Sequence, residues 1–313
     1  MTLAPFVRIV AQGKGRARSL TQGEATEAMG LILADKADPE AVGALLMVMR
    51  LRGETDEEIA GFTAALRESI APLPKADLDW PCYAAGRTRG APLFLLAAKV
   101  VALAGYTVVM HGWNSHQSAS ADLRAAIKEV GLEGGGLTYR PLETLSPAAF
   151  GLLRLREVLG LRSCINTVLR MWNPTAALAS VQGVFHPSYR GLQSRAAALL
   201  GDRNLTVIKG GGGEFECNPA KDAFVFGLRN GVELNEVFPA RIQETRRLHE
   251  PEKAVDLAAL WAGFQTDSFA EVTVISTAAL ALWTLGAEET PIAAATLASE
   301  IWHNRHVHAR RAG

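Results

Sequence analysis

Short amphipathic segments, each bounded by helix-start and helix-stop signals, occupy the first 70 residues of the chain. Two of them begin with a threonine that is followed three positions later by a glutamate, at Thr21 and Glu24 and again at Thr55 and Glu58. In such a capping box the two side chains satisfy each other's free backbone N–H groups. Gly53 follows an apolar segment and is typical of a helix C-terminus. The pattern predicts a small bundle of helices.

A different pattern begins after residues 72–81, which contain three prolines and are interpreted as a linker. Short apolar runs now alternate with longer helical segments. The expected helices lie at 91–104, 121–130, 187–200, 270–285 and 291–308, and the expected strands at 106–110, 181–185, 205–208 and 223–228. Such alternation predicts a largely parallel sheet covered by helices. We therefore expect an α/β protein: a small N-terminal helical domain (1–72, with part of the later helices) plus a larger α/β domain (73–313) with a mainly parallel sheet.

Three features bear on where the protein works. The sequence contains no run of about 18 consecutive apolar residues, so we expect no membrane span. Its N-terminus lacks the basic and apolar regions of a signal peptide. Cys82, Cys164 and Cys217 are odd in number and far apart, which favours reduced thiols over disulfides or a metal site. We expect a cytoplasmic protein with no membrane partner.

Charge is balanced overall but unevenly distributed. Basic and acidic residues number 32 each, so the net charge does not indicate a nucleic-acid partner. Basic residues nevertheless concentrate in segments 1–20, 139–170 and 301–313. Both a polarised surface and three ordinary solvated faces are compatible with this distribution. The first two segments include Lys14, Arg16, Arg18, Arg162 and Arg170.

Four consecutive glycines, Gly210 to Gly213, separate an apolar run at 205–208 from two carboxylates, Glu214 and Glu216. A strand that breaks into glycines lets the backbone bend sharply or approach a ligand closely. Carboxylates just beyond such a turn are suited to hold Mg²⁺ on a phosphorylated substrate. A flexible connection with two solvated acids is the alternative interpretation of the same residues.

Two further segments carry a resemblance to a known family. Residues 161–174 read Leu-Arg-Ser-Cys-Ile-Asn-Thr-Val-Leu-Arg-Met-Trp-Asn-Pro, and residues 183–187 read Gly-Val-Phe-His-Pro. On these segments the chain resembles the anthranilate phosphoribosyltransferase family, also called glycosyltransferase family 3. The resemblance covers nearly the whole chain and implies a nucleoside phosphorylase/phosphoribosyltransferase-like fold. The positions in register with the family pattern are Arg162, Asn166, Asn173 and Pro174.

The segment that the resemblance assigns to the donor phosphates departs from the family. Members of the family hold phosphoribosyl pyrophosphate with Gly-Thr-Gly-Gly-Asp after a strand, because bare backbone N–H groups bind phosphate well. The matching residues 83–90 read Tyr-Ala-Ala-Gly-Arg-Thr-Arg-Gly. Gly86 is retained, but the segment now contains Arg87 and Arg89, which would bind phosphate by charge. A surface turn with two solvated arginines is the alternative.

A second phosphate segment also departs. The family's His-Gly-Asn-Arg-Ser becomes His111-Gly112-Trp113-Asn114-Ser115, so the arginine position is Asn114. Trp113 would offer a stacking surface for a base, and ordinary packing is its alternative role. The family's metal-holding Asp-Gly-Leu-Asp-Glu aligns with residues 212–216, where Phe215 replaces the central aspartate and Glu216 is retained. Glu214 carries a carboxylate one position away.

These departures resemble a divergent, YbiB-like branch of the family, whose members are understood to be dimers that bind nucleic acid without sequence specificity. Our main hypothesis is therefore a phosphoribosyltransferase-fold protein that has lost anthranilate phosphoribosyltransferase chemistry, needs no cofactor, and binds nucleic acid as a homodimer joined through its helical domain. The residues expected to meet phosphates are Lys14, Arg16, Arg18, Arg87, Arg89, His111, Trp113, Asn114, Arg162 and Arg170.

In the alternative hypothesis the protein retains enzymatic activity. It is a glycosyltransferase family 3 phosphoribosyltransferase with an altered donor site, acting on anthranilate or another acidic aromatic acceptor. Mg²⁺ is expected only in this case, with Glu216 and Glu214 as its ligands. The substrate residues would be Arg162, Asn166, Gly86 and Gly112. A dimeric scaffold without a ligand is a third hypothesis.

Overall fold

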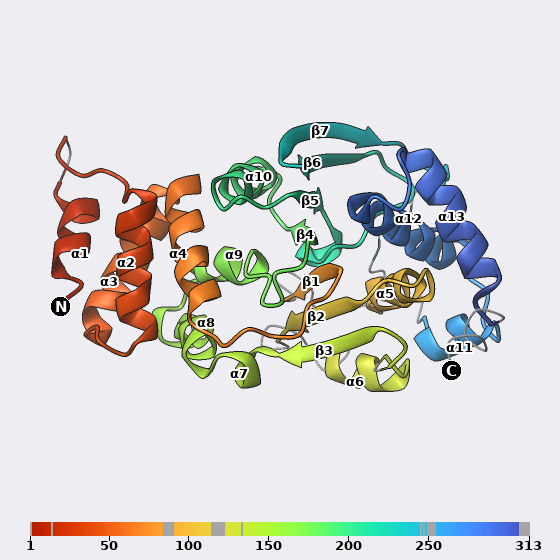
Figure 1. Cartoon of the computed structure of the whole chain (residues 1–313), viewed down its shortest axis with the longest axis horizontal. Coiled ribbons are helices and arrows are strands. Elements are labelled where there is room, and N and C mark those ends of the chain that lie inside the picture. The colour runs from red at the N-terminus through yellow and green to blue at the C-terminus, as the bar shows by residue number, and fades with distance from the viewer. Residues whose placement is uncertain are drawn as a thin grey trace.

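The computed structural model describes residues 2–13, 15–83, 91–113, 123–132, 134–244, 246, 248 and 255–306. Helices α1 (Ala4–Ala11), α2 (Gln22–Leu33), α3 (Pro39–Arg52) and α4 (Asp56–Glu68) form a bundle at one end of the molecule (Figure 1). Both predicted capping boxes are present at the starts of α2 and α4. The small N-terminal helical domain is confirmed, and its boundary at residue 72 stays a prediction.

The rest of the described chain is built on a seven-stranded sheet with strand order β3-β2-β1-β4-β5-β6-β7. The first five strands in this order run parallel, and β6 and β7 add an antiparallel hairpin at one edge. The predicted α/β domain with a mainly parallel sheet is confirmed. The strands are β1 (Leu78–Cys82), β2 (Val108–Gly112), β3 (Leu137–Pro141), β4 (Ala179–Val184), β5 (Asn204–Lys209), β6 (Ala223–Arg229) and β7 (Val232–Phe238).

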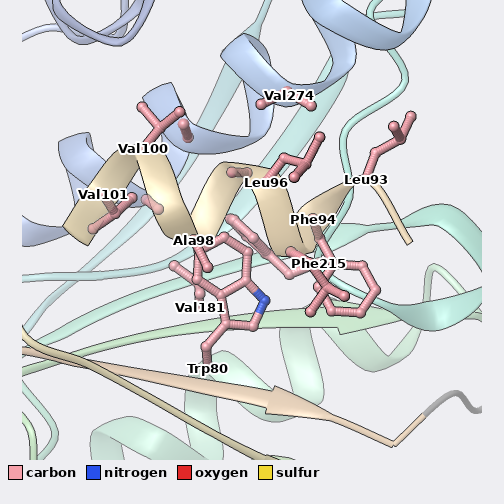
Figure 2. Close-up of a cluster of buried hydrophobic side chains, with 14 of the residues drawn as sticks. Trp80, Leu93, Phe94, Leu96, Ala98, Val100, Val101, Val181, Phe215 and Val274 are labelled. Carbon is pink, nitrogen blue, oxygen red and sulfur yellow. The ribbon is translucent and has the colours of Figure 1, made fainter. Parts of the chain in front are cut away.

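Helices cover both faces of the sheet and create two apolar cores. The bundle and α7–α10 share one core, and α5, α6 and α11–α13 share the other (Figure 1). In Figure 2 the rings of Trp80 and Phe215 meet beneath α5, edge to face with centroids 5.4 Å apart. The helices are α5 (Phe94–Leu103), α6 (Leu123–Glu129), α7 (Leu142–Leu145), α8 (Pro147–Leu159), α9 (Ile165–Arg170), α10 (Tyr189–Leu199), α11 (Leu257–Ala262), α12 (Ser268–Leu285) and α13 (Pro291–His303).

Strand β1 corrects the interpretation of residues 72–81 as a linker. This buried strand lies at the centre of the sheet, between β2 and β4. Asp79 and Pro81 interrupt the apolar run and hid the strand from the sequence pattern. Proline has no N–H to donate to a neighbouring strand, and the pairing of β1 with β4 ends at Asp79, before Pro81 is reached.

The C-terminal helices differ from expectation only at their end. α12 is long and apolar enough to cross a membrane by length and composition, but 78% of it is buried inside the protein, where it packs against α5 and α13. It is a core helix, as its sequence predicts. α13 ends at His303, and residues 307–308 of the expected helix lie outside the described residues. Asn304 forms a turn, and Arg305 donates hydrogen bonds to the carbonyls of Trp261 and Leu260 at the end of α11.

The glycine run ends β5 and forms a tight turn. Gly212 and Gly213 adopt positive φ values of 62° and 90°, which side chains rarely allow. The backbone of Glu214 then lies directly against β4, where a Cβ added to Gly183 would come within 2.1 Å of the Glu214 carbonyl carbon. The absence of a side chain at residue 183 therefore lets the turn seat on the sheet.

Replacing Gly183 with alanine should destabilise the protein by about 3 kcal/mol, because the new methyl group meets backbone that has little freedom to shift. Gly151→Ala is the matched control: its site on α8 is open, and alanine there should stabilise the helix by about 0.5–1 kcal/mol. Urea unfolding followed by circular dichroism measures both. An unfolding free energy for Gly183→Ala close to that of the parent would contradict the role assigned to this contact.

Candidate functional site

The sheet opens at the junction of β1 and β4. The two strands are paired only at Leu78 with Ala179 and at Asp79 with Ser180, and they separate toward their carboxyl ends. The chain proceeds from β1 to β2 on one side of this junction and from β4 to β5 on the other. In open α/β sheets, ligands bind at the carboxyl ends of the strands where the order reverses in this way.

A cavity of about 90 Å³ lies at this end of β4. Its walls come from both domains, because α3 contributes Arg50 while α9, α10 and the adjoining loops contribute the remaining polar side chains. The lining is strongly basic and rich in amides. Its chemically active members are Arg50, Arg162, Asn166, Arg170, His186 and Gln193.

A larger cavity of about 510 Å³ lies at the opposite edge of the sheet, where β4 and β5 begin. Two arginines line it, Arg67 and Arg203, and Arg67 is already fully engaged. It forms an ion pair with Asp202 and donates to the carbonyls of Met171 and Trp172. Because parallel sheets bind their ligands at the carboxyl edge, the smaller cavity is the candidate site.

The arginines of the smaller cavity repel one another. Burial, followed by the charges of Arg156, Arg170 and Arg50, lowers the pKa of Arg162 to about 10. Burial also lowers the pKa of Arg170, against the opposing effect of Glu214. Within the described part of the chain, none of Arg50, Arg162 and Arg170 forms an ion pair. Clustered, partly desolvated cations that form no ion pair favour an anionic ligand.

Buried polar atoms around this cavity lack hydrogen-bond partners. Arg170 is 6% exposed, and its Nη1 donates to the Asn166 carbonyl at 3.1 Å while its Nη2 has no acceptor. Nδ2 of Asn166 and Oε1 of Gln193 are also unpartnered. Each such atom costs about 1–3 kcal/mol. A bound anion would give acceptors to both nitrogen atoms, so the arrangement is suited to hold a carboxylate or a phosphate.

The proposed metal carboxylates have other surroundings. Oε2 of Glu216 accepts a hydrogen bond from the backbone N–H of Phe94 at 2.9 Å, where it caps α5. Glu214 is buried, and Phe215 is packed in the core against Trp80. No group of three or more candidate metal ligands occurs among the residues that the structure describes. A metal-binding role for Glu214 and Glu216 stays a prediction.

The described residues of the second phosphate segment contact other parts of the protein. Nδ1 of His111 lies 2.7 Å from the Tyr83 hydroxyl, and Nε2 lies 3.1 Å from Oδ1 of Asp79 at angles outside hydrogen-bond geometry. Trp113 packs edge to face against Phe150, with centroids 4.7 Å apart. Gly112 allows β2 to approach β1, because a Cβ there would lie 1.8 Å from the Cys82 carbonyl oxygen.

The other residues predicted to meet nucleic acid do not join the cavity. Arg18 forms an exposed ion pair with Glu24 at 2.7 Å, and Arg16 is exposed between α1 and α2. Of the predicted set, the structure brings Arg162, Asn166 and Arg170 together in one wall. The predicted residues that lie outside the described residues are Lys14, Gly86, Arg87, Arg89 and Asn114.

Sequence reasoning noted His186 only as part of the segment 183–187, and it missed Arg50 and Gln193 as residues of the cavity. Arg50 lies in the helical domain, far from the other lining residues along the chain, and no local pattern links it to them. Gln193 lies within an ordinary amphipathic helix, and its neighbours gave no signal of a site. Only tertiary packing brings both residues to the cavity.

Comparison with known proteins agrees with this geometry. Residues 6–70 match the family described as "Glycosyl transferase family, helical bundle domain". The chain is 31% identical over 233 residues to an anthranilate phosphoribosyltransferase of Roseiflexus castenholzii, covering 69% of this chain and 68% of that protein. A relative with the same name from Myxococcus xanthus is 32% identical over 234 residues, covering 68% and 67%. The chain belongs to the anthranilate phosphoribosyltransferase family.

The solved structures support the family and its fold. The anthranilate phosphoribosyltransferase of Thermus thermophilus superposes with a TM-score of 0.74 at 26% identity, covering 94% of this chain and 95% of that one. The Saccharomyces cerevisiae enzyme, in complex with PRPP and Mg, has a TM-score of 0.72 at 15% identity over 99% and 95% of the two chains, and shows the shared fold. The family resemblance is confirmed, and membership of the YbiB-like branch stays a prediction.

An Arg170→Met variant should lose anion binding while remaining folded. Methionine has a similar length, and it removes a buried charge that forms no ion pair within the described residues, so the variant should remain folded, while the parent should gain about 2.7 kcal/mol at a benzoate concentration 100 times its Kd. The measurement is thermal unfolding in sodium benzoate and in sodium chloride at equal ionic strength. Arg154→Met, on the exposed face of α8, is the control that should still respond to benzoate. An equal benzoate response in Arg170→Met would contradict this site.

Proposed function

We propose that this protein is a phosphoribosyltransferase with an altered donor site, whose arginine-lined cavity holds the carboxylate of anthranilate or another acidic aromatic acceptor. The observation that carries the proposal is the buried guanidinium of Arg170, with an unpartnered Nη2, beside the desolvated Arg162. The names of the relatives support the same class of reaction.

The reaction of this class joins an acceptor nitrogen to C1 of the ribose while the bond from C1 to pyrophosphate breaks, and the nitrogen loses a proton. The role inferred for Arg162 and Arg170 is to hold and orient the acceptor through charge-assisted hydrogen bonds, with Asn166 as a further donor. A fixed orientation removes much of the entropic barrier to bond formation. The proposal rests on this acceptor side, and no step is assigned to Mg²⁺.

The nucleic-acid hypothesis gains no support from the relatives or from the geometry. Its described residues lie apart, in the loop between α1 and α2, on β2 and in the cavity. Nucleic-acid binding, the loss of transferase activity and the homodimer through the helical domain stay predictions. The transferase is favoured because the cavity lies where an α/β sheet binds small ligands.

With anthranilate, phosphoribosyl pyrophosphate and Mg²⁺, the purified protein should release pyrophosphate and form a phosphoribosyl adduct. Arg162→Gln should raise KM for the acceptor about tenfold to a hundredfold, because a hydrogen bond to a charged group is worth about 1.5–3 kcal/mol. A coupled pyrophosphate assay measures turnover, and mass spectrometry identifies the adduct. Arg154→Gln should leave KM unchanged. The proposal would be overturned if the parent turned over neither anthranilate nor any other amino-substituted aromatic acid that is tested.

A further inference from the structure

A chain of four buried side chains links the cavity to the centre of the sheet. Gln193 on α10 hydrogen-bonds to Gln182 on β4, Gln182 to Ser180 on the same strand, and Ser180 to Asp79 on β1. Gln193 and Asp79 are both 0% exposed. Apolar residues usually fill the interior of a sheet. The presence of four hydrogen-bonded polar residues there calls for a reason other than packing.

The carboxylate of Asp79 fixes the direction of every bond in this chain. A carboxylate only accepts, so the Ser180 hydroxyl donates its one proton to Oδ2 of Asp79, at 2.8 Å. The Ser180 oxygen then accepts from Nε2 of Gln182, at 3.3 Å. This turns Oε1 of Gln182 toward Gln193, and that oxygen accepts from Nε2 of Gln193. The orientation of both amides thus follows from the charge at the far end.

The result is an unsatisfied acceptor beside the cavity. The amide nitrogen of Gln193 is committed to Gln182, and its Oε1 is buried without a donor. Gln193 lines the same cavity as Arg162 and Arg170. The cavity therefore combines cationic donors, which match an anion, with a neutral acceptor that lacks a donor, which matches an N–H or O–H group.

The geometry points to Gln193 as a specificity-determining residue that selects ligands carrying a hydrogen-bond donor next to their anionic group. This inference rests on the proposed function, because it concerns the same acceptor cavity. Asp79 is a positioning residue that acts through Ser180 and Gln182. A ligand without the donor leaves Oε1 of Gln193 buried and unpaired, which should weaken binding about tenfold to a hundredfold.

Anthranilate and benzoate test the inference, because they share the ring and the carboxylate and only anthranilate carries an amino group. Isothermal titration of the parent should show anthranilate binding at least about tenfold more tightly than benzoate. Gln193→Leu should bring the two affinities within about twofold of each other, with benzoate bound at least as well as by the parent. Benzoate binding thus also shows that the variant is folded, and Gln193→Met provides a second test of the same loss.

A Gln182→Leu variant tests whether the hydrogen-bonded side chains behind Gln193 contribute to the preference, or Gln193 alone. This variant leaves Gln193 in place but removes the acceptor that orients its amide, so the preference for anthranilate should fall between those of the parent and Gln193→Leu. A preference in Gln182→Leu equal to that of the parent would overturn the positioning by Asp79.

Two outcomes separate the inference from the proposed function. If the parent binds both acids and Gln193→Leu keeps the parent's preference, or if the parent has no preference, the inference is wrong and the acceptor site stands. If the parent binds neither acid, the proposed function and the inference fail together.

Discussion

A single buried carboxylate, Asp79, determines how the centre of the sheet is arranged. It accepts a hydrogen bond from Ser180 on β4 and lies 3.1 Å from Nε2 of His111 on β2, so it contacts both neighbours of its own strand. A buried charge is tolerated only where such partners surround it. β1 departs from β4 directly after this contact. The orientation of Gln193 follows from this carboxylate through Ser180 and Gln182, and the sheet opens directly beyond it.

Two groups of arginines have different physical roles. Arg67 and Arg305 are engaged with carboxylate or carbonyl oxygens and join elements that are distant in sequence. Arg50, Arg162 and Arg170 form no ion pair within the described residues, although burial penalises the charge of the last two and the carboxylate of Glu214 favours that of Arg170. Such a cluster of cations does not stabilise the fold by itself, but it is what an anion-binding site needs.

The fold was largely predictable because its signals are local. A capping box such as that at Thr21 needs only four consecutive residues, and strand–helix alternation survives errors of a few positions at each boundary. β1 was not predicted, because Asp79 and Pro81 interrupt its apolar pattern at the junction with β4. The site was only half predictable: the family pattern supplied residues of α9, while Arg50 and Gln193 reach the cavity through tertiary packing that leaves no mark on neighbouring sequence.

Arg50 places part of the cavity wall in a different domain from the sheet. One wall of the cavity is carried by α3, a helix of the bundle, while the strands and the amide chain belong to the α/β domain. Substitutions in the bundle can therefore alter the charge and shape presented to a ligand without disturbing the sheet. The sheet and the wall that carries Arg50 are on separate elements, so the ligand preference of the cavity can change while the central strands stay intact.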